Sequence, residues 1–297
     1  MALVALIAVA AVWGVTFVQV KDAVELYPLF AFLGVRFAIA SATLAVPGLG
    51  RLRGLGREGV GPGLMLGLLL ALGYTLQTAG LERTTVSGTG FVTGMYVVLT
   101  PVLALALFRS RIGPAAWAGV ALSTAGLVLL AGIHGSATGD LLVLAGAAVY
   151  SLQIVLMERY APQYEPVAFT LVEMVAACAG LLAVALALGD LGVPRGWTVW
   201  GALLVTGIFA SALAFLAQTW AQRRTSATRT ALAFALEPVF AAVFGYTLAG
   251  DRLGAVGWAG CAAIMAGIVL AEPAAGAVLV SAAARRRDSR RRWRPTR

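Results

Sequence analysis

The sequence predicts an all-α integral membrane protein with ten transmembrane helices, arranged as two inverted five-helix repeats. Three observations predict this fold. Of the 297 residues, 60% are hydrophobic and only 12% are charged, whereas soluble domains carry about 25% charged residues. Ten apolar stretches are each long enough to cross a bilayer. One apolar segment also occurs twice, once in each half of the chain.

The predicted spans leave only short connections. They run approximately over residues 2–20, 28–46, 62–81, 86–108, 115–133, 141–157, 167–188, 197–221, 230–249 and 253–271. The longest connections have about 8–15 residues, too few for a soluble catalytic or regulatory domain. The only lysine, Lys21, is not part of a phosphate-binding glycine loop, so we expect solute movement to be secondary or passive. No positive region precedes the first stretch, which predicts a span and not a cleaved signal peptide.

Positive charge predicts which ends of the spans are cytoplasmic, because Lys and Arg residues of short loops are retained on that side. With the N-terminus inside, seventeen of them lie in cytoplasmic segments, and the four outside are Lys21, Arg83, Arg195 and Arg252. Both termini are therefore predicted to be cytoplasmic, which requires an even number of spans. Twenty-one arginines beside one lysine favour a GC-rich bacterial genome, so the predicted location is a bacterial inner membrane.

Residues 273–297 are predicted to form a polybasic cytoplasmic tail, with Trp293 among eight arginines. We interpret this tail as a topology anchor that lies on anionic lipid. Binding of nucleic acid would need folded context that so short a segment lacks. The net charge of +9 is therefore interpreted as a consequence of membrane topology and not of an acidic partner.

The internal repeat is clearest in two tryptophan segments. Residues 117–130 match residues 258–271 at 8 of 14 positions, with an offset of 141. The predicted repeats are residues 1–133 and residues 141–272. Because each repeat has five spans, an odd number, the second must enter the membrane in the opposite sense. Inverted repeats are a common plan in secondary transporters, with the substrate site near the midplane between them, although a duplicated channel would share this symmetry.

Several short motifs follow one another in a particular order. They are Trp13-Gly14 and Thr16-Phe17 in the first span, Arg36-Phe37 in the second, Gly90-Phe91-Val92-Thr93-Gly94 and Leu99-Thr100-Pro101 in the fourth, Leu236-Glu237-Pro238-Val239-Phe240 in the ninth, and the two Trp-Ala-Gly segments. With these motifs the chain resembles the drug/metabolite transporter superfamily, EamA type, over nearly its whole length. The resemblance implies ten helices in inverted repeats and a central cavity lined chiefly by helices one, three, four, six, eight and nine. It implies little about the substrate.

Three charged side chains lie inside predicted spans: Arg36, Glu173 and Glu237. A charge inside a span costs about 2.5–3.5 kcal/mol or more, so each asks for a partner, an aqueous cavity or a function. An offset of 137 makes Arg36 and Glu173 equivalent, and their depths leave roughly 9 Å of height between them. We hypothesise that they neutralise each other or each other's neighbours. The alternative is that each snorkels or meets a separate backbone group.

Two prolines predict helix breaks. Pro101 and Pro238 lack an N–H and interrupt the helical ladder, which exposes carbonyls to any cavity that they face. Paired breaks in corresponding helices point to a transport site. Pro101 lies about one turn later in its repeat than Pro238. The positions of the fourth helix that line the cavity are therefore predicted only to within one turn. Glu237 is a candidate for proton coupling, since a buried carboxyl group can exchange a proton near neutral pH; the alternative is a structural carboxylate.

Polar and aromatic residues on the expected cavity helices are candidate substrate contacts. They are Trp13, Thr16, Tyr74, Gln77, Tyr96, Tyr150, Gln153, Gln218 and Trp220. These groups suit an amphipathic organic solute, because aromatic faces offer apolar area or attract a cation, while amides and hydroxyls fix orientation. Each is alternatively a packing or interfacial residue.

The predicted function is that of a secondary transporter, an exporter, of small organic metabolites or drugs by alternating access. The alternatives are a channel or a structural membrane partner. An enzyme is not predicted, because an intramembrane serine protease needs Ser with His or Lys on facing helices, whereas His134 lies in a predicted loop and Lys21 at a membrane edge. One histidine and two separated cysteines, Cys178 and Cys261, predict neither a metal site nor a cofactor. Expected partners are the small-molecule substrate and the bilayer; a homodimer stays open, as do the substrate and the coupling ion.

Overall fold

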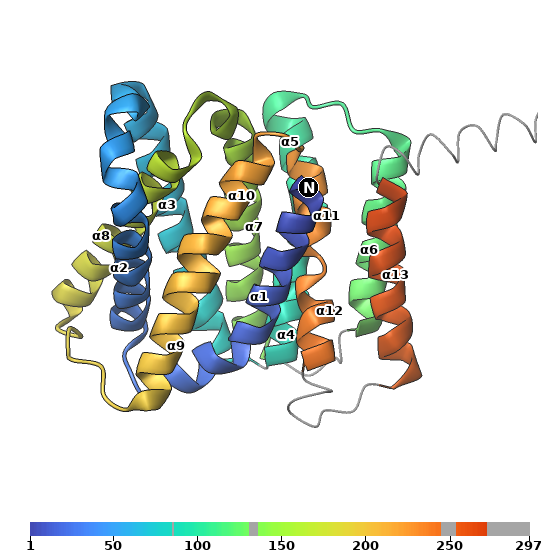
Figure 1. Ribbon diagram of the computed structural model, residues 1–297. Helices are drawn as coiled ribbons and strands as arrows, with labels where there is room; N and C mark the ends of the chain where they lie inside the picture. The colour runs from blue at the N-terminus through green and yellow to red at the C-terminus, as the bar shows by residue number, and fades with distance from the viewer. Residues whose placement is uncertain (85, 131–135, 245–253, 272–297) are drawn as a thin grey trace, which may run out of the picture.

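The chain folds into a bundle of helices packed side by side (Figure 1). The computed structural model describes residues 1–84, 86–130, 136–244 and 254–271, and these ranges contain no β-strand. In chain order the α-helices are α1 (Ala2–Val24), α2 (Leu29–Gly48), α3 (Leu52–Leu81), α4 (Val86–Gly94), α5 (Tyr96–Phe108), α6 (Pro114–Leu130), α7 (Ala137–Tyr160), α8 (Pro166–Leu188), α9 (Trp197–Gly207), α10 (Ala214–Gln222), α11 (Ala227–Phe234), α12 (Glu237–Phe244) and α13 (Ala255–Ala271). The short helical segments η1 (Leu49–Arg51), η2 (Ala161–Gln163) and η3 (Ile208–Leu213) connect some of them. His134, Arg252 and the predicted tail 273–297 lie outside the described residues.

Several segments of the described chain are long and apolar enough to cross a membrane. Seven segments meet this description: Ala2–Val24, Leu29–Leu81, Gly88–Phe108, Ala137–Gln163, Pro166–Leu188, Trp197–Gln222 and Ala227–Phe244. The second of them contains both α2 and α3, which η1 joins without an extended loop. Two further apolar helices, Pro114–Leu129 and Ala255–Ala271, are shorter.

Two predicted spans begin too late. Helix α3 starts at Leu52 and not at residue 62, because the segment after α2 is itself helical. Gly56 kinks this helix with a φ of 66°, a conformation that glycine adopts at little cost. Helix α7 starts at Ala137 and not at residue 141, and the carboxylate of Asp140 lies in its first turn, where negative charge complements the helix dipole.

The fourth predicted span is broken, but not where we expected. The break lies at Met95, between α4 and α5, and the predicted break at Pro101 is wrong because Pro101 lies inside α5. Helix α4 contains three glycines in nine residues, and glycine lowers helix stability before Met95. In the ninth span, α11 ends at Phe234 and α12 begins at Glu237, directly before Pro238. Pro238 is the second residue of α12, where its missing N–H costs no helical hydrogen bond.

The two breaks are equivalent positions of the chain. Met95 and Leu236, the residues before α5 and α12, are 141 residues apart. This is the offset of the two tryptophan segments. Tyr96 is therefore the counterpart of Glu237, which resolves the one-turn uncertainty that the two prolines left.

The helices pack in pairs that match between the two parts of the chain, residues 1–130 and residues 136–271. Helix α2 packs on α8, and α6 packs on α13, so each of these pairs joins equivalent helices. Helix α3 packs on α7 as α1 packs on α9 and α10, and α5 packs on α7 as α1 packs on α12. Between α6 and α13 the backbones are close: a Cβ atom on Gly126 would lie 2.6 Å from the carbonyl oxygen of Gly260. The glycines of the tryptophan segments thus allow this close crossing.

Successive connections alternate between the two ends of the bundle. Figure 1 shows the N-terminus and the connections α2–α3, α5–α6, α7–α8 and α10–α11 at the upper end, so that α1 runs downward and α7 upward. Contacts at the lower end agree with this direction. Lys21 Nζ donates to the carbonyl of Thr84 over 3.0 Å, and Thr84 Oγ1 donates to Asp140 in the first turn of α7 over 2.7 Å.

Candidate functional site

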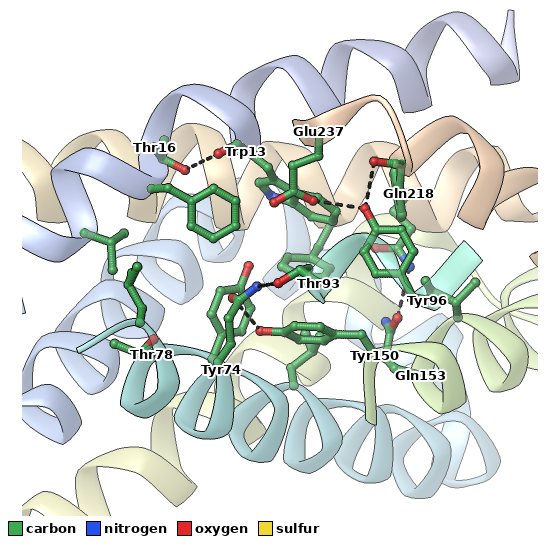
Figure 2. A pocket seen from close by; sticks show the side chains of 18 of the residues that line it. Trp13, Thr16, Tyr74, Thr78, Thr93, Tyr96, Tyr150, Gln153, Gln218 and Glu237 are labelled. Atoms are coloured by element: carbon green, nitrogen blue, oxygen red, sulfur yellow. Dashed lines mark hydrogen bonds between the residues drawn. The ribbon is translucent and has the colours of Figure 1, made fainter. Parts of the chain in front are cut away.

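A pocket lies in the middle of the bundle, among helices from both parts of the chain (Figure 2). Its walls come from α1, α2, α3, α4, α5, α7, α10, α11 and α12. The empty space is about 650 Å³, including the part open to solvent. The lining residues are Trp13, Thr16, Phe17, Val20, Arg36, Leu70, Tyr74, Gln77, Thr78, Leu81, Thr93, Tyr96, Tyr150, Gln153, Ile154, Phe215, Gln218, Phe234 and Glu237.

The structure brings together all but one of the candidate substrate contacts. The exception is Trp220, which does not line the pocket; the Arg224 guanidinium lies 4.7 Å from its ring centre instead. Residues two places apart on a helix point to different faces, so Trp220 turns away from the pocket that Gln218 lines. Sequence reasoning missed Thr78 and Thr93, because isolated threonines in apolar spans carry no distinguishing signal.

Arg36 enters the pocket wall from α2. Its Nε donates to Ser211 Oγ over 2.8 Å, and an Nη donates to the hydroxyl of Tyr74 over 3.1 Å. The guanidinium also lies 4.5 Å from the centre of the Tyr74 ring, a cation–π contact. The predicted direct pairing with Glu173 is not present, because Arg36 turns toward α3 and η3 while Glu173 turns toward α7. Within the described residues, an ion pair joins Arg83 to Glu82 and involves neither Arg36 nor Glu173.

A second group of hydrogen bonds holds the α3 side of the pocket. Gln77 Nε2 donates to Thr93 Oγ1 over 2.9 Å, and the Tyr150 hydroxyl donates to Gln77 Oε1 over 3.1 Å. Both ends of the Gln77 amide are therefore occupied. Across the pocket, Trp13 Nε1 donates to the carbonyl of Ala210 over 2.8 Å, which leaves its ring faces to neighbouring aromatic side chains and the pocket.

Glu237 lies at the start of α12 and faces Tyr96 at the start of α5 (Figure 2). The Tyr96 hydroxyl lies 3.0 Å from Glu237 Oε2 and 2.7 Å from the carbonyl oxygen of Phe234. Glu237 is 4% exposed and Tyr96 2%. The helix breaks at Met95 and Leu236 thus deliver two equivalent residues to one contact inside the pocket.

Glu173 does not line the pocket but reaches it through amides. Its Oε1 accepts from Gln153 Nε2 over 2.8 Å, and Gln153 Oε1 accepts from Gln218 Nε2 over 3.0 Å. Gln218 Nε2 also donates to Gln222 Oε1, and Gln222 Nε2 donates to the carbonyl of Ile154, both over 2.8 Å. We call Glu173, Gln153, Gln218 and Gln222 the amide chain. In the described residues no group of three or more His, Cys, Asp or Glu side chains is placed to hold a metal ion.

Comparison with known proteins agrees with this architecture. Residues 1–132 and 137–271 match the EamA-like transporter family. The chain belongs to this family. It is 31% identical, over 88% of its length and 82% of the relative's, to an "Uncharacterized transporter" of Archaeoglobus fulgidus. This EamA-like chain is also 28% identical to the "Uncharacterized inner membrane transporter YedA" of Escherichia coli strain K12, over 90% of its length and 89% of the relative's.

The fold is also found among solved structures. A crystal structure of a protein with 20% sequence identity aligns with a TM-score of 0.76, covering 93% of this chain and 98% of that one. At this identity the match shows the fold alone. Together with the apolar helices, the family membership shows that the chain is a multi-pass, all-α membrane transporter protein.

Proposed function

We propose that this EamA-like protein is a secondary transporter that exports small amphipathic organic metabolites or drugs by alternating access. One observation carries the proposal: the pocket is lined by helices from both parts of the chain, whose packing contacts match in pairs. A site placed between two such parts can be opened to either end by rocking one part against the other.

The proposed topology has ten spans in two inverted repeats, residues 1–133 and 141–272. The opposite directions of α1 and α7 in Figure 1 support it. The arginines next to η1, α5, α7 and α10 belong to connections at the end where the N-terminus lies, and positive residues favour the cytoplasm. We therefore propose a bacterial inner membrane, cytoplasmic termini, and a polybasic tail, 273–297, that contacts anionic lipid.

The chemistry of the pocket supports an amphipathic solute. Rings of Trp13, Tyr74 and Tyr150 offer apolar contact, while the amide of Gln218 offers a hydrogen bond. Such a lining, mostly apolar with a few convergent polar groups, is typical of small-molecule sites. The proposed substrate therefore combines a ring or chain of apolar atoms with a polar group.

We further propose that Glu237 couples transport to protons. A phenol has one proton, so Tyr96 can donate fully to only one of its two neighbours. When it donates to the nearer Phe234 carbonyl, which can only accept, a hydrogen bond between Tyr96 and Glu237 requires a proton on the carboxyl group. Arg36, Tyr74 and Tyr150 are the other charged or titratable groups that line the pocket.

Counterflow in proteoliposomes of the purified protein tests the proposal. Vesicles are loaded with unlabelled amino acids, nucleosides or organic cations, and uptake of the labelled compound is followed with and without a pH gradient. We expect saturable counterflow of at least one compound, blocked by competing compounds. Flux that rises linearly with concentration and is not exchanged would favour a channel, and no movement of any compound would contradict the proposed carrier.

A further inference from the structure

The amide chain has a direction that its two ends impose. The carbonyl of Ile154 can only accept, so Gln222 must turn Nε2 toward it and Oε1 toward Gln218. At the other end Gln153 turns Nε2 toward Glu173 and so presents Oε1 to Gln218. The placement of O and N in a glutamine amide follows from such partners.

Both neighbours of Gln218 therefore present an acceptor oxygen to it, so Gln218 must donate to both. Its Nε2 donates one N–H to Gln153 and the other to Gln222. These two hydrogen bonds use both protons of the amide nitrogen. The remaining atom, Gln218 Oε1, is buried and has no hydrogen-bond partner among the described residues. Gln218 lines the pocket and is 0% exposed.

A buried acceptor without a donor is costly, and the cost is removed when a donor arrives. We propose that Gln218 Oε1 is the specificity-determining acceptor of the pocket and selects solutes that carry an N–H or O–H donor on their polar group. This rests on the proposed transport function. Gln218 is enclosed in the present conformation, so the donor reaches it when the surrounding side chains rearrange during transport.

Glu173 holds the other end of the amide chain. It does not touch the solute, but as an acceptor it keeps the Gln153 amide turned so that Gln218 must donate. Gln222 Oε1, which the Ile154 carbonyl fixes, requires the same donor from Gln218, so the two ends of the amide chain act together.

The equivalent glutamine of the first repeat provides a matched control. Gln77 lies 141 residues before Gln218 and also lines the pocket. Its Oε1 already accepts from Tyr150, and its Nε2 donates to Thr93. Gln77 thus has the same side chain in the same pocket but no free acceptor.

The test compares two pairs of aromatic probes by their effect on the melting temperature of the purified full-length protein. One pair is phenylacetamide and N,N-dimethylphenylacetamide, which are both neutral. The other is phenethylammonium and N,N,N-trimethylphenethylammonium, which carry the same charge. Within each pair only one member has N–H donors. Affinities are obtained from the dependence of the melting temperature on probe concentration.

For the wild type we expect the donor-bearing member to bind about tenfold more tightly, which corresponds to about 1.4 kcal/mol. Gln218→Leu should bring the ratio within each pair close to one, whereas Gln77→Leu should keep it. A general loss of packing lowers both affinities of a pair together, so the ratio reports the acceptor and not the stability.

A wild-type ratio near one, no stabilisation by either donor-bearing probe, or a ratio that survives in Gln218→Leu would overturn the proposal. The proposed carrier function is tested separately. A clear ratio without counterflow would support the binding inference and contradict transport. Counterflow with a ratio near one would support transport and contradict the binding inference.

Discussion

Replacing Gly14 with alanine is expected to lower the melting temperature of the protein by about 6–12 °C and to abolish counterflow. Gly14 lies on α1 where this helix crosses α12. A Cβ atom there would lie 2.6 Å from the carbonyl oxygen of Glu237 and 2.9 Å from the nitrogen of Ala241. Both neighbours are backbone atoms, so α12 itself must move, and such overpacking costs about 3 kcal/mol. The displacement also moves the start of α12, from which Glu237 enters the pocket.

Gly201→Ala is the matched control for this prediction. It adds the same methyl group to a helical glycine in α9, where the nearest heavy atom, Trp197 Nε1, would lie 3.9 Å away. Since alanine favours helix by about 1 kcal/mol over glycine, the melting temperature of this variant should be unchanged or slightly higher. Thermal unfolding in detergent and counterflow of the same preparations check both variants. Equal stability of the two proteins would show that α1 and α12 do not rely on this close crossing.

The helical architecture could be predicted because hydropathy and internal repetition can be read along the sequence without knowledge of the three-dimensional contacts. The tryptophan segments identified the repeat, and their shared glycines lie where α6 and α13 cross closely. Helix breaks were harder. Pro101 stays inside a helix while Met95 interrupts one, because neighbouring glycines and tertiary contacts, not one proline, decided where the ladder ends.

The members of the pocket were largely predictable, whereas their contacts were not. Aromatic and amide residues in apolar spans are conspicuous, and all but Trp220 of those named line the pocket. The partners of a buried charge depend on helix rotation, which the sequence does not contain. Equivalent positions suggested that Arg36 pairs with Glu173, yet the true equivalent contact joins Tyr96 to Glu237, at an offset of 141 and not 137.

Glu237→Gln is expected to abolish the effect of a pH gradient on transport while it preserves counterflow. In the wild type we expect a gradient to change the rate of solute accumulation by about tenfold, a typical size for coupling between two bound species. Glutamine keeps the shape and hydrogen bonding of a protonated carboxyl group but cannot release a proton. Exchange of labelled for unlabelled solute needs no net proton movement, so it should continue in this variant.

Tyr96→Phe tests the hydrogen bond to Glu237 separately from the carboxyl group itself. Without the hydroxyl, Glu237 loses its 3.0 Å hydrogen bond, but the carboxyl group itself remains and can still exchange a proton. We therefore expect gradient-driven accumulation to persist with a shifted pH dependence. Glu25→Gln, which changes an exposed carboxylate at the end of α1, should behave as the wild type. Accumulation by Glu237→Gln that still follows the gradient would assign proton coupling to another group, and loss of both counterflow and accumulation would make Glu237 a structural or substrate-binding residue instead.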